Sequence, residues 1–264
     1  YNAIEIKSKD EIGELTADFN TMTEAVKQKV EKLEDIASER KVFIDNMTHE
    51  MKTPLTSIIG FSDLLRSARL DDETVHDYAE SIYKEGKYLK SISSKLMDLI
   101  LLRQKPEMTE IDVPRLVEEI DESVRPIASS RQVAFSAASV EAKLVCDREL
   151  IKSLLYNLID NAVKASQPGT CVTLNAYFTQ DGVMEFSVAD QGSGIPKEEL
   201  DKIFEPFYRV DKARSRKYGG AGLGLALCME IAHAHAATLE IESEVGRGTV
   251  IRLRFDGKGK GSVL

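Results

Sequence analysis

The stretch His49-Glu50-Met51-Lys52-Thr53-Pro54-Leu55 lies in the middle of a helical pattern. Apolar residues recur around it at steps of three and four, the spacing that gathers side chains on one face of an α-helix. They are Ile44, Met47, Met51, Leu55, Ile58 and Leu65. The pattern predicts an amphipathic helix whose apolar face packs against a core or a partner helix.

His49 and Thr53 are expected on the other, solvent-facing side of this helix. At about 100° per residue, His49 lies roughly 200° from the neighbouring apolar positions, and Thr53 lies about 40° round from it and one turn further along. Pro54 removes the N–H that would bond the carbonyl oxygen of Glu50, so a kink is expected just past the histidine. A single exposed histidine is most often only a solvated residue, so the rest of the chain has to decide its role.

The composition limits the class of protein. The chain has 264 residues, of which 42% are hydrophobic and 30% are charged, with no tryptophan. This length suits two domains of ordinary size in a helix-rich soluble chain. The formal charge of −9 argues against direct nucleic-acid binding, which needs a basic surface. Three cysteines without C-x-x-C spacing favour reduced, buried thiols over a disulfide or zinc framework.

Membrane attachment is expected only outside this sequence. No apolar run approaches the roughly 18 residues that a membrane-spanning helix needs, and no signal-peptide pattern is present. The chain begins at Tyr1, inside a patterned segment and without a methionine. We therefore expect the cytoplasmic portion of a longer membrane receptor, joined to the membrane only through a missing N-terminal region.

A second apolar pattern precedes the histidine segment. It consists of Ile12, Leu15, Phe19, Met22, Val26, Val30, Leu33 and Ile36 or Ala37. Charged residues flank this near-heptad seam, as in a two-stranded coiled coil. The successive steps of four at Met22, Val26 and Val30 form a stutter that locally unwinds such a coil. We expect two helices to pair along this seam.

Another amphipathic helix follows Asp71-Asp72, a pair that can cap it. Its apolar face carries Val75, Tyr78, Ile82, Leu89, Ile92, Leu96 and Leu99. Together with the histidine-bearing helix it forms a helical hairpin, and one hairpin cannot bury both apolar stripes. Two chains should therefore pack as a dimeric four-helix bundle. The pattern ends near Pro106, with Pro114 soon after, so the domain boundary is expected there.

Helical and strand signals alternate beyond this boundary. Helices are expected over residues 115–128 and 150–165, the second capped by Asp147. Strands are expected at residues 133–135, 143–146, 171–178, 184–189, 238–241 and 249–255. Hairpin turns at 181–182 and 246–248 join the last two pairs. This alternation predicts an α/β sandwich with helices on one face of a mixed sheet.

Three polar side chains share one face of the otherwise apolar helix expected at 150–165. They are Asn157, Asn161 and Lys164, at positions i, i+4 and i+7. Asparagine is a poor helix former, so two aligned asparagines suggest a function. An amide oxygen is a hard ligand that suits Mg²⁺, and a lysine three residues on can reach a phosphate. The alternative is a merely solvated polar face.

Two glycine-rich stretches follow. Asp190-Gln191-Gly192-Ser193-Gly194 comes directly after a strand, where the carboxylate can accept a hydrogen bond from an adenine amino group and the glycines let backbone approach a ligand. A lone D-x-G-x-G also describes an ordinary turn. The second stretch, Gly219-Gly220-Ala221-Gly222-Leu223-Gly224-Leu225, strengthens the nucleotide hypothesis, because it opens a helix and offers free N–H groups to phosphate.

A basic loop separates the two glycine-rich stretches. It starts at Phe204-Glu205-Pro206-Phe207-Tyr208-Arg209 and continues with Lys212, Arg214, Arg216 and Lys217. As a lid over a nucleotide, it would let Tyr208 lean on the nucleotide and Arg209 meet its terminal phosphate. The alternative is that these charges are only solvated.

These motifs, in this order, resemble those of a sensor histidine kinase of the two-component type, and the resemblance covers nearly the whole chain. The histidine segment resembles the phosphoacceptor box of that family, and residues 157–164 resemble its asparagine box. The resemblance implies that His49 is phosphorylated, that Asn161 binds Mg²⁺, and that Asn157 and Lys164 contact phosphate. It also places Thr249 below the adenine pocket.

The resemblance implies four segments. Residues 1–38 form a coiled-coil linker derived from a HAMP relay, 39–105 a dimerisation and histidine phosphotransfer domain, 106–256 an ATP-binding catalytic domain of the GHKL or Bergerat type, and 257–264 a disordered tail. A plain dimerisation coil is the alternative for the first segment. One departure is visible, since Ala236 and Ala237 stand where the family usually has two glycines.

The implied activity is ATP-dependent phosphorylation of His49 within a homodimer. Nε2 of the imidazole attacks the γ-phosphate, while Glu50 accepts a hydrogen bond from Nδ1–H and acts as the general base. The phosphoryl group then passes to an aspartate on the receiver domain of a response regulator. The spacing of Glu50 and Thr53 resembles the motif with which such kinases also dephosphorylate their regulator.

Two other functions fit part of the pattern. An ATP-driven clamp, as in gyrase, the ninety-kilodalton heat-shock chaperone and MutL, uses the same nucleotide fold. Those clamps lack a phosphoacceptor hairpin upstream and carry a catalytic carboxylate on the asparagine-bearing helix, whereas Asp160 lies about 100° from Asn161. A non-catalytic dimerisation scaffold would need a degraded nucleotide site, and this one is intact in sequence.

Overall fold

The computed structural model describes residues 4–5, 10–101, 106–210 and 221–255. The chain divides into two compact units, residues 1–53 and 54–264, and the division falls inside the first helix. No helix within the described ranges is long and apolar enough to cross a membrane. The predicted tail and the second half of the predicted basic loop, from residue 211 on, lie outside the described residues.

The first unit contains the N-terminal part of α1 (Glu11–Ser67), a helix that continues without a break through Pro54. Asp10 accepts a hydrogen bond from the Ile12 N–H (N to Oδ1 3.1 Å) at its start. The seven apolar residues of the seam between Ile12 and Leu33 are each 46–65% exposed. A single chain therefore leaves the predicted coiled-coil seam in water. The kink expected at Pro54 stays a prediction.

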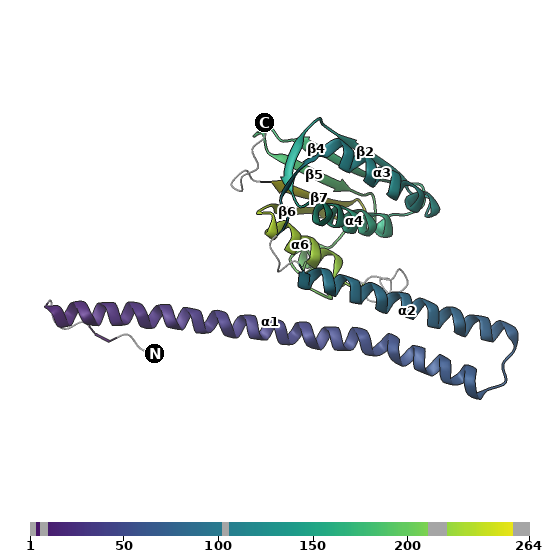
Figure 1. Cartoon of the computed structure of the whole chain (residues 1–264), viewed down its shortest axis with the longest axis horizontal. Coiled ribbons are helices and arrows are strands. Elements are labelled where there is room, and N and C mark those ends of the chain that lie inside the picture. Colours follow the sequence, from purple (N-terminus) through teal and green to yellow (C-terminus); the bar gives the residue numbers. More distant parts are fainter. Residues whose placement is uncertain (1–3, 6–9, 102–105, 211–220, 256–264) are drawn as a thin grey trace. The chain divides into compact units, whose positions relative to one another are not determined.

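The second unit begins with a helical hairpin made by the end of α1 and by α2 (Asp72–Leu101) (Figure 1). Asp71 caps α2, because its Oδ1 accepts a hydrogen bond from the Thr74 N–H at 2.8 Å and its Oδ2 one from the Thr74 hydroxyl at 3.0 Å. The rings of Phe61 and Tyr78 lie 5.2 Å apart between the two helices. The predicted hairpin and its cap are confirmed, whereas its pairing with a second hairpin stays a prediction.

The rest of the second unit is an α/β sandwich. Its elements are β1 (Thr109–Asp112), α3 (Val113–Ser130), β2 (Ala134–Ser139), β3 (Lys143–Cys146), α4 (Arg148–Ala165), β4 (Cys171–Phe178), β5 (Met184–Ala189), η1 (Lys197–Glu199), α6 (Gly224–Ala234), β6 (Thr238–Glu244) and β7 (Gly248–Phe255). Five strands form a mixed sheet in the order β2-β4-β5-β7-β6, in which only β2 and β4 pair in parallel. β1 and β3 form a separate antiparallel pair.

The three helices α3, α4 and α6 cover one face of the five-stranded sheet (Figure 1). Alternate residues of the central strands enter the core beneath them: Val172, Leu174, Ala176, Met184, Phe186, Val188, Ile251 and Leu253. The opposite face is polar, and there the buried Glu185 lies 3.7 Å from Arg252 Nε and 3.6 Å from Arg254 Nε. The predicted sandwich with helices on one face is confirmed.

α3 begins two residues earlier than predicted. Asp112 is its N-cap and accepts a hydrogen bond from the Arg115 N–H at 2.9 Å. Pro114, which suggested a boundary, stands in the first helical turn, where a missing N–H costs nothing. β1 was not predicted, because its four residues include only one buried side chain, Ile111, and show no readable alternation.

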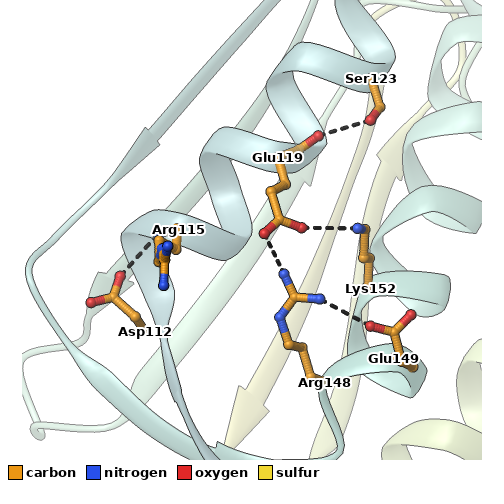
Figure 2. Close-up of polar contacts among 7 residues, drawn as sticks. All are labelled: Asp112, Arg115, Glu119, Ser123, Arg148, Glu149 and Lys152. Atoms are coloured by element: carbon orange, nitrogen blue, oxygen red, sulfur yellow. Dashed lines mark hydrogen bonds and ion pairs between the residues drawn. The ribbon is translucent and has the colours of Figure 1, made fainter.

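The start of α4 is fixed by charged contacts with α3 (Figure 2). Glu119 of α3 accepts hydrogen bonds from Arg148 (2.5 Å) and Lys152 (2.9 Å), and these two cations hold the pKa of the Glu119 carboxyl below its usual value. Asp147 caps α4 as predicted. Because the ion pairs are partly in water, they orient α4 more than they stabilise the fold.

The chain leaves α6 through His235, Ala236 and Ala237. Nε2 of His235 accepts a hydrogen bond from the Asp147 N–H at 3.0 Å, which links the end of α6 to the start of α4. Ala236 has φ +50°, and the Ala237 N–H donates to the carbonyl oxygen of Ala232 at 2.9 Å, as in a helix cap with a left-handed residue. An alanine therefore occupies a position that normally favours glycine.

Candidate active site

The phosphoacceptor segment lies on the exposed surface of α1. His49 and Thr53 are both exposed, as predicted, and Glu50 is half-buried. The Thr53 hydroxyl donates to the carbonyl oxygen of His49 at 3.4 Å. This back-bond lies beside the gap in the helix ladder that Pro54 creates at Glu50, and bonds of this kind bend helices. Thr53 therefore has a local structural contact in addition to its predicted role.

The two asparagines of α4 meet the first residue of α6. Asn157 and Asn161 are half-buried, and the Asn157 amide nitrogen donates to the Ser153 carbonyl oxygen at 2.9 Å. A Cβ placed on Gly224 would lie 3.2 Å from Asn157 Oδ1 and 3.7 Å from Asn161 Nδ2. The structure thus brings together the asparagine motif and the second glycine-rich stretch. The sequence showed the order of these motifs but not that they are in contact.

An open pocket of about 430 Å³ lies along this face of α4. It is lined by Ser91 and Lys95 of α2 and by Glu149, Lys152, Ser153, Tyr156, Asn157, Asp160 and Lys164 of α4. Lys164 bonds Asp160 (Nζ to Oδ2 2.6 Å), and Asp160 is exposed. The contribution of α2 to this pocket was not predicted, because no motif marks Ser91 or Lys95.

Asp190 directly follows β5 and lies beside Thr249 of β7. The Asp190 N–H donates to the Thr249 carbonyl oxygen at 2.9 Å, and Asp190 Oδ1 accepts a hydrogen bond from the Gly192 N–H at 2.8 Å. Burial raises the pKa of the Asp190 carboxyl, and hydrogen bonds from Gly192 and Thr249 only partly oppose this. The buried Thr249 hydroxyl lies 2.9 Å from the Ser243 hydroxyl, a partner that the sequence analysis missed.

The glycines of the first stretch are required by packing. A Cβ on Gly192 would lie 2.6 Å from the carbonyl oxygen of Ala165, at the end of α4. Gly194 has φ +65°, and its Cβ would lie 2.1 Å from the carbonyl oxygen of Glu244. The loop after β5 is therefore clamped between the end of α4 and the β6–β7 turn, which holds Asp190 in place.

The second glycine-rich stretch supports the start of the predicted lid. Gly222 has φ +70°, and its carbonyl oxygen accepts a hydrogen bond from the Phe207 N–H at 2.8 Å. Leu223 is fully buried, and its side chain does not cap the N–H groups at the start of α6. Gly220 and the four basic residues from Lys212 to Lys217 lie outside the described residues.

Tyr208 and Arg209 contact protein groups in this structure. The Tyr208 hydroxyl bonds the carboxylate of Glu199. Arg209 donates from a terminal guanidinium nitrogen to the hydroxyl of Tyr88 on α2 at 2.8 Å. Their expected contacts with a nucleotide stay predictions, and the bond to Tyr88 was not foreseen.

Comparisons with known proteins identify two family regions. Residues 39–104 match the His Kinase A (phospho-acceptor) domain, and residues 146–259 match the histidine kinase-, DNA gyrase B- and HSP90-like ATPase. The chain is 30% identical over 256 residues to the sensor histidine kinase YkoH of Bacillus subtilis, which covers 96% of this chain and 54% of that protein. It is 32% identical over 185 residues to the sensor-like histidine kinase SenX3 of Mycolicibacterium smegmatis, and this match covers 69% of this chain and 48% of that protein.

The fold is also found in a solved structure. The histidine kinase ThkA, crystallised in complex with the response regulator protein TrrA, superposes with a TM-score of 0.67 at 22% identity, over 84% of this chain and 65% of that one. The chain spans about half the length of the curated relatives it matches. On these matches and on the order of its motifs, the chain belongs to the sensor histidine kinases and carries their phosphoacceptor and ATPase domains.

Proposed function

We propose that this chain is an ATP-dependent protein histidine kinase that phosphorylates its own His49 and passes the phosphoryl group to an aspartate of a response regulator. One observation carries the proposal. The asparagine amides of α4 converge on the uncapped start of α6 above an open pocket, in a chain that also presents an exposed histidine. An exposed acceptor and an open polar pocket that can take phosphate groups are what phosphoryl transfer between two domains requires.

The residues in and around the pocket fit Mg-ATP. Glycine at position 224 leaves room between the Asn157 amide and the first turn of α6, whose N–H groups favour an anion. Asn161 would hold Mg²⁺, which neutralises phosphate charge when bound. Asn157 and Lys164 would contact phosphate, and Asp190 would accept a hydrogen bond from the adenine amino group.

The chemical step uses groups of the phosphoacceptor segment. A bond forms between Nε2 of His49 and the γ-phosphorus, and the bond from that phosphorus to the β,γ-bridging oxygen breaks, so that ADP leaves. Glu50 accepts the Nδ1 proton and fixes the reactive tautomer. The imidazole is exposed, so it can present the same phosphoryl group to a receiver domain.

We also propose that the protein acts as a homodimer. The exposed seam of α1 is a long apolar stripe of the kind that marks a protein interface. It is continuous with the helical hairpin, which lies in the region matched by the phospho-acceptor model. The location expected from the sequence, at the cytoplasmic side of a membrane receptor, stays a prediction.

A second activity is phosphatase action on the regulator. Its support is the spacing of Glu50 and Thr53 and the exposure of Thr53 one turn beyond His49. The back-bond from Thr53 to the His49 carbonyl favours the competing explanation, a purely structural role beside Pro54. The clamp hypothesis has less support, because the carboxylate of Asp160 is bound to Lys164.

Incubation with labelled Mg-ATP tests the main proposal. The label should appear on His49 as a phosphoramidate, stable in alkali and lost in acid. The His49→Gln variant should remain unlabelled but still bind ATP, because the pocket is lined by α2 and α4, beside the start of α6, and not by the phosphoacceptor segment. Label that survives acid and maps to serine or threonine would contradict the assignment.

A further inference from the structure

Lys95 of α2 lies at the phosphate end of the proposed nucleotide site. α2 packs against α6, and Lys95 is half-buried at this contact. A Cβ on Gly224 would lie 3.4 Å from Lys95 Nζ and 3.2 Å from Asn157 Oδ1. The ammonium group thus lies at the first residue of α6, next to the asparagine amides.

This is an unfavourable place for a cation without an anion. The N-terminus of a helix carries partial positive charge. Burial lowers the pKa of the Lys95 ammonium, and repulsion from Lys164 lowers it further, while Asp160 and Asp98 offset only part of this. Three ammonium groups, those of Lys95, Lys152 and Lys164, line the pocket, and the start of α6 lies beside that of Lys95.

The other pocket lysines have carboxylate partners. Lys152 bonds Glu119 at 2.9 Å, and Lys164 bonds Asp160 at 2.6 Å. Among the described residues, none forms a hydrogen bond or ion pair with Lys95 Nζ. Lys95 is therefore the one lysine lining this pocket whose ammonium has no carboxylate partner among the described residues.

We propose that Lys95 binds the terminal phosphates of the nucleotide, so that ATP is held by the phosphotransfer hairpin as well as by the catalytic domain. The inference rests on the proposed function, because it takes the pocket to be the ATP site. The oxygens of a polyphosphate would accept hydrogen bonds from the Lys95 ammonium, the Lys164 ammonium and the N–H groups of α6 together. It would also strengthen the contact between α2 and α6 while the nucleotide is bound.

The opposite possibility is that Lys95 obstructs the site. An ammonium in the place of the metal or phosphate would compete with Mg-ATP, and its removal would tighten binding. The electrostatics favour the first possibility, since an obstructing cation would be expected to pair with the acidic groups of its pocket. The two possibilities predict opposite signs in a binding measurement.

Calorimetric titration of the whole chain with a non-hydrolysable Mg-ATP analogue, Mg-ADP and AMP separates them. Lys95→Met should weaken binding of the triphosphate roughly tenfold, the loss expected for one charge-assisted hydrogen bond. The loss should be smaller for ADP and absent for AMP, and Lys95→Arg should restore most of it. Lys84→Met is the matched control, because Lys84 is an exposed lysine of α2 that pairs with Glu80 at 3.2 Å.

Protection from chemical modification gives a second measurement on the unaltered protein. Amine acetylation near neutral pH should modify Lys95 readily, and the triphosphate should protect Lys95 but not Lys84. Unchanged or tighter triphosphate binding in Lys95→Met, or equal loss for AMP, would overturn the inference while leaving the kinase proposal in place. A wild-type chain that binds no adenine nucleotide would overturn both.

Discussion

His49 and Asn161 carry the two halves of the proposed reaction, but the chain holds them in different ways. His49 lies exposed on α1, where the nearby apolar residues Val42 and Ile44 are also more than half exposed. Asn161 lies on α4, whose opposite side is packed into the core through Leu158 and Ile159, each at most 2% exposed. An imidazole that must meet both ATP and a regulator has to be reachable, whereas a phosphate site gains from fixed geometry.

This contrast predicts the largest effect at the fixed site. Asn161→Ala should reduce autophosphorylation on the order of 100-fold, because it removes the proposed metal ligand from a preorganised pocket. Asp160→Asn, at an exposed residue about 100° round the helix from Asn161, should cost much less. The measurement is the initial rate of labelling with Mg-ATP. Equal losses in two variants that keep the wild-type circular dichroism would favour the clamp mechanism.

At the exposed site, substitutions should separate two activities instead of removing one. Glu50→Ala should lose most autophosphorylation, about tenfold or more, because the Nδ1 proton then lacks its acceptor. Thr53→Ala should keep most autophosphorylation but lose most dephosphorylation of the phosphorylated regulator, since its hydroxyl would position the attacking water. Paired assays of both activities check this. If Thr53→Ala changes both together or neither, the hydroxyl serves only the helix beside Pro54.

For the catalytic domain, the sequence predicted the strands and motifs more completely than the contacts between them. The bounds of β3, β4 and β5 agree with prediction, because buried strands with clear turns leave a strong local signal. The asparagine and glycine motifs were located, but their meeting at Gly224 required the fold. Lys95 and the bond from Arg209 to Tyr88 could not be predicted, since periodicity shows which face of α2 is apolar but not what packs there.

A smaller effect is expected at Asp190, where the carboxyl proposed to recognise adenine lowers the stability of the fold at neutral pH. Burial raises its folded-state pKa above the unfolded value, so its contribution to stability is full below about pH 3.9 and is lost as the pH rises through the folded pKa. Asp190→Asn should therefore melt a few degrees higher at pH 7, with the difference shrinking in acid, while its preference for adenine over guanine nucleotides falls. Thermal melts over a pH series measure the first effect. A lower melting temperature at pH 7 would mean that the carboxylate's bond to Gly192 outweighs its burial.

The smallest expected effect concerns the left-handed cap of α6. Ala236 is exposed and has φ +50°, a conformation that costs a residue with a Cβ roughly 1 kcal/mol relative to glycine. Ala236→Gly should raise the free energy of unfolding by about 0.5–1 kcal/mol, reduced somewhat by the greater entropy of the unfolded glycine chain. Ala234→Gly, two residues earlier and still helical, should lower it by a similar amount. Urea unfolding of both variants gives the comparison, and the same sign in both would show that the backbone at position 236 is not strained. His235, the neighbouring residue, keeps its hydrogen bond to the start of α4 in the Ala236→Gly variant. Autophosphorylation should therefore be unchanged.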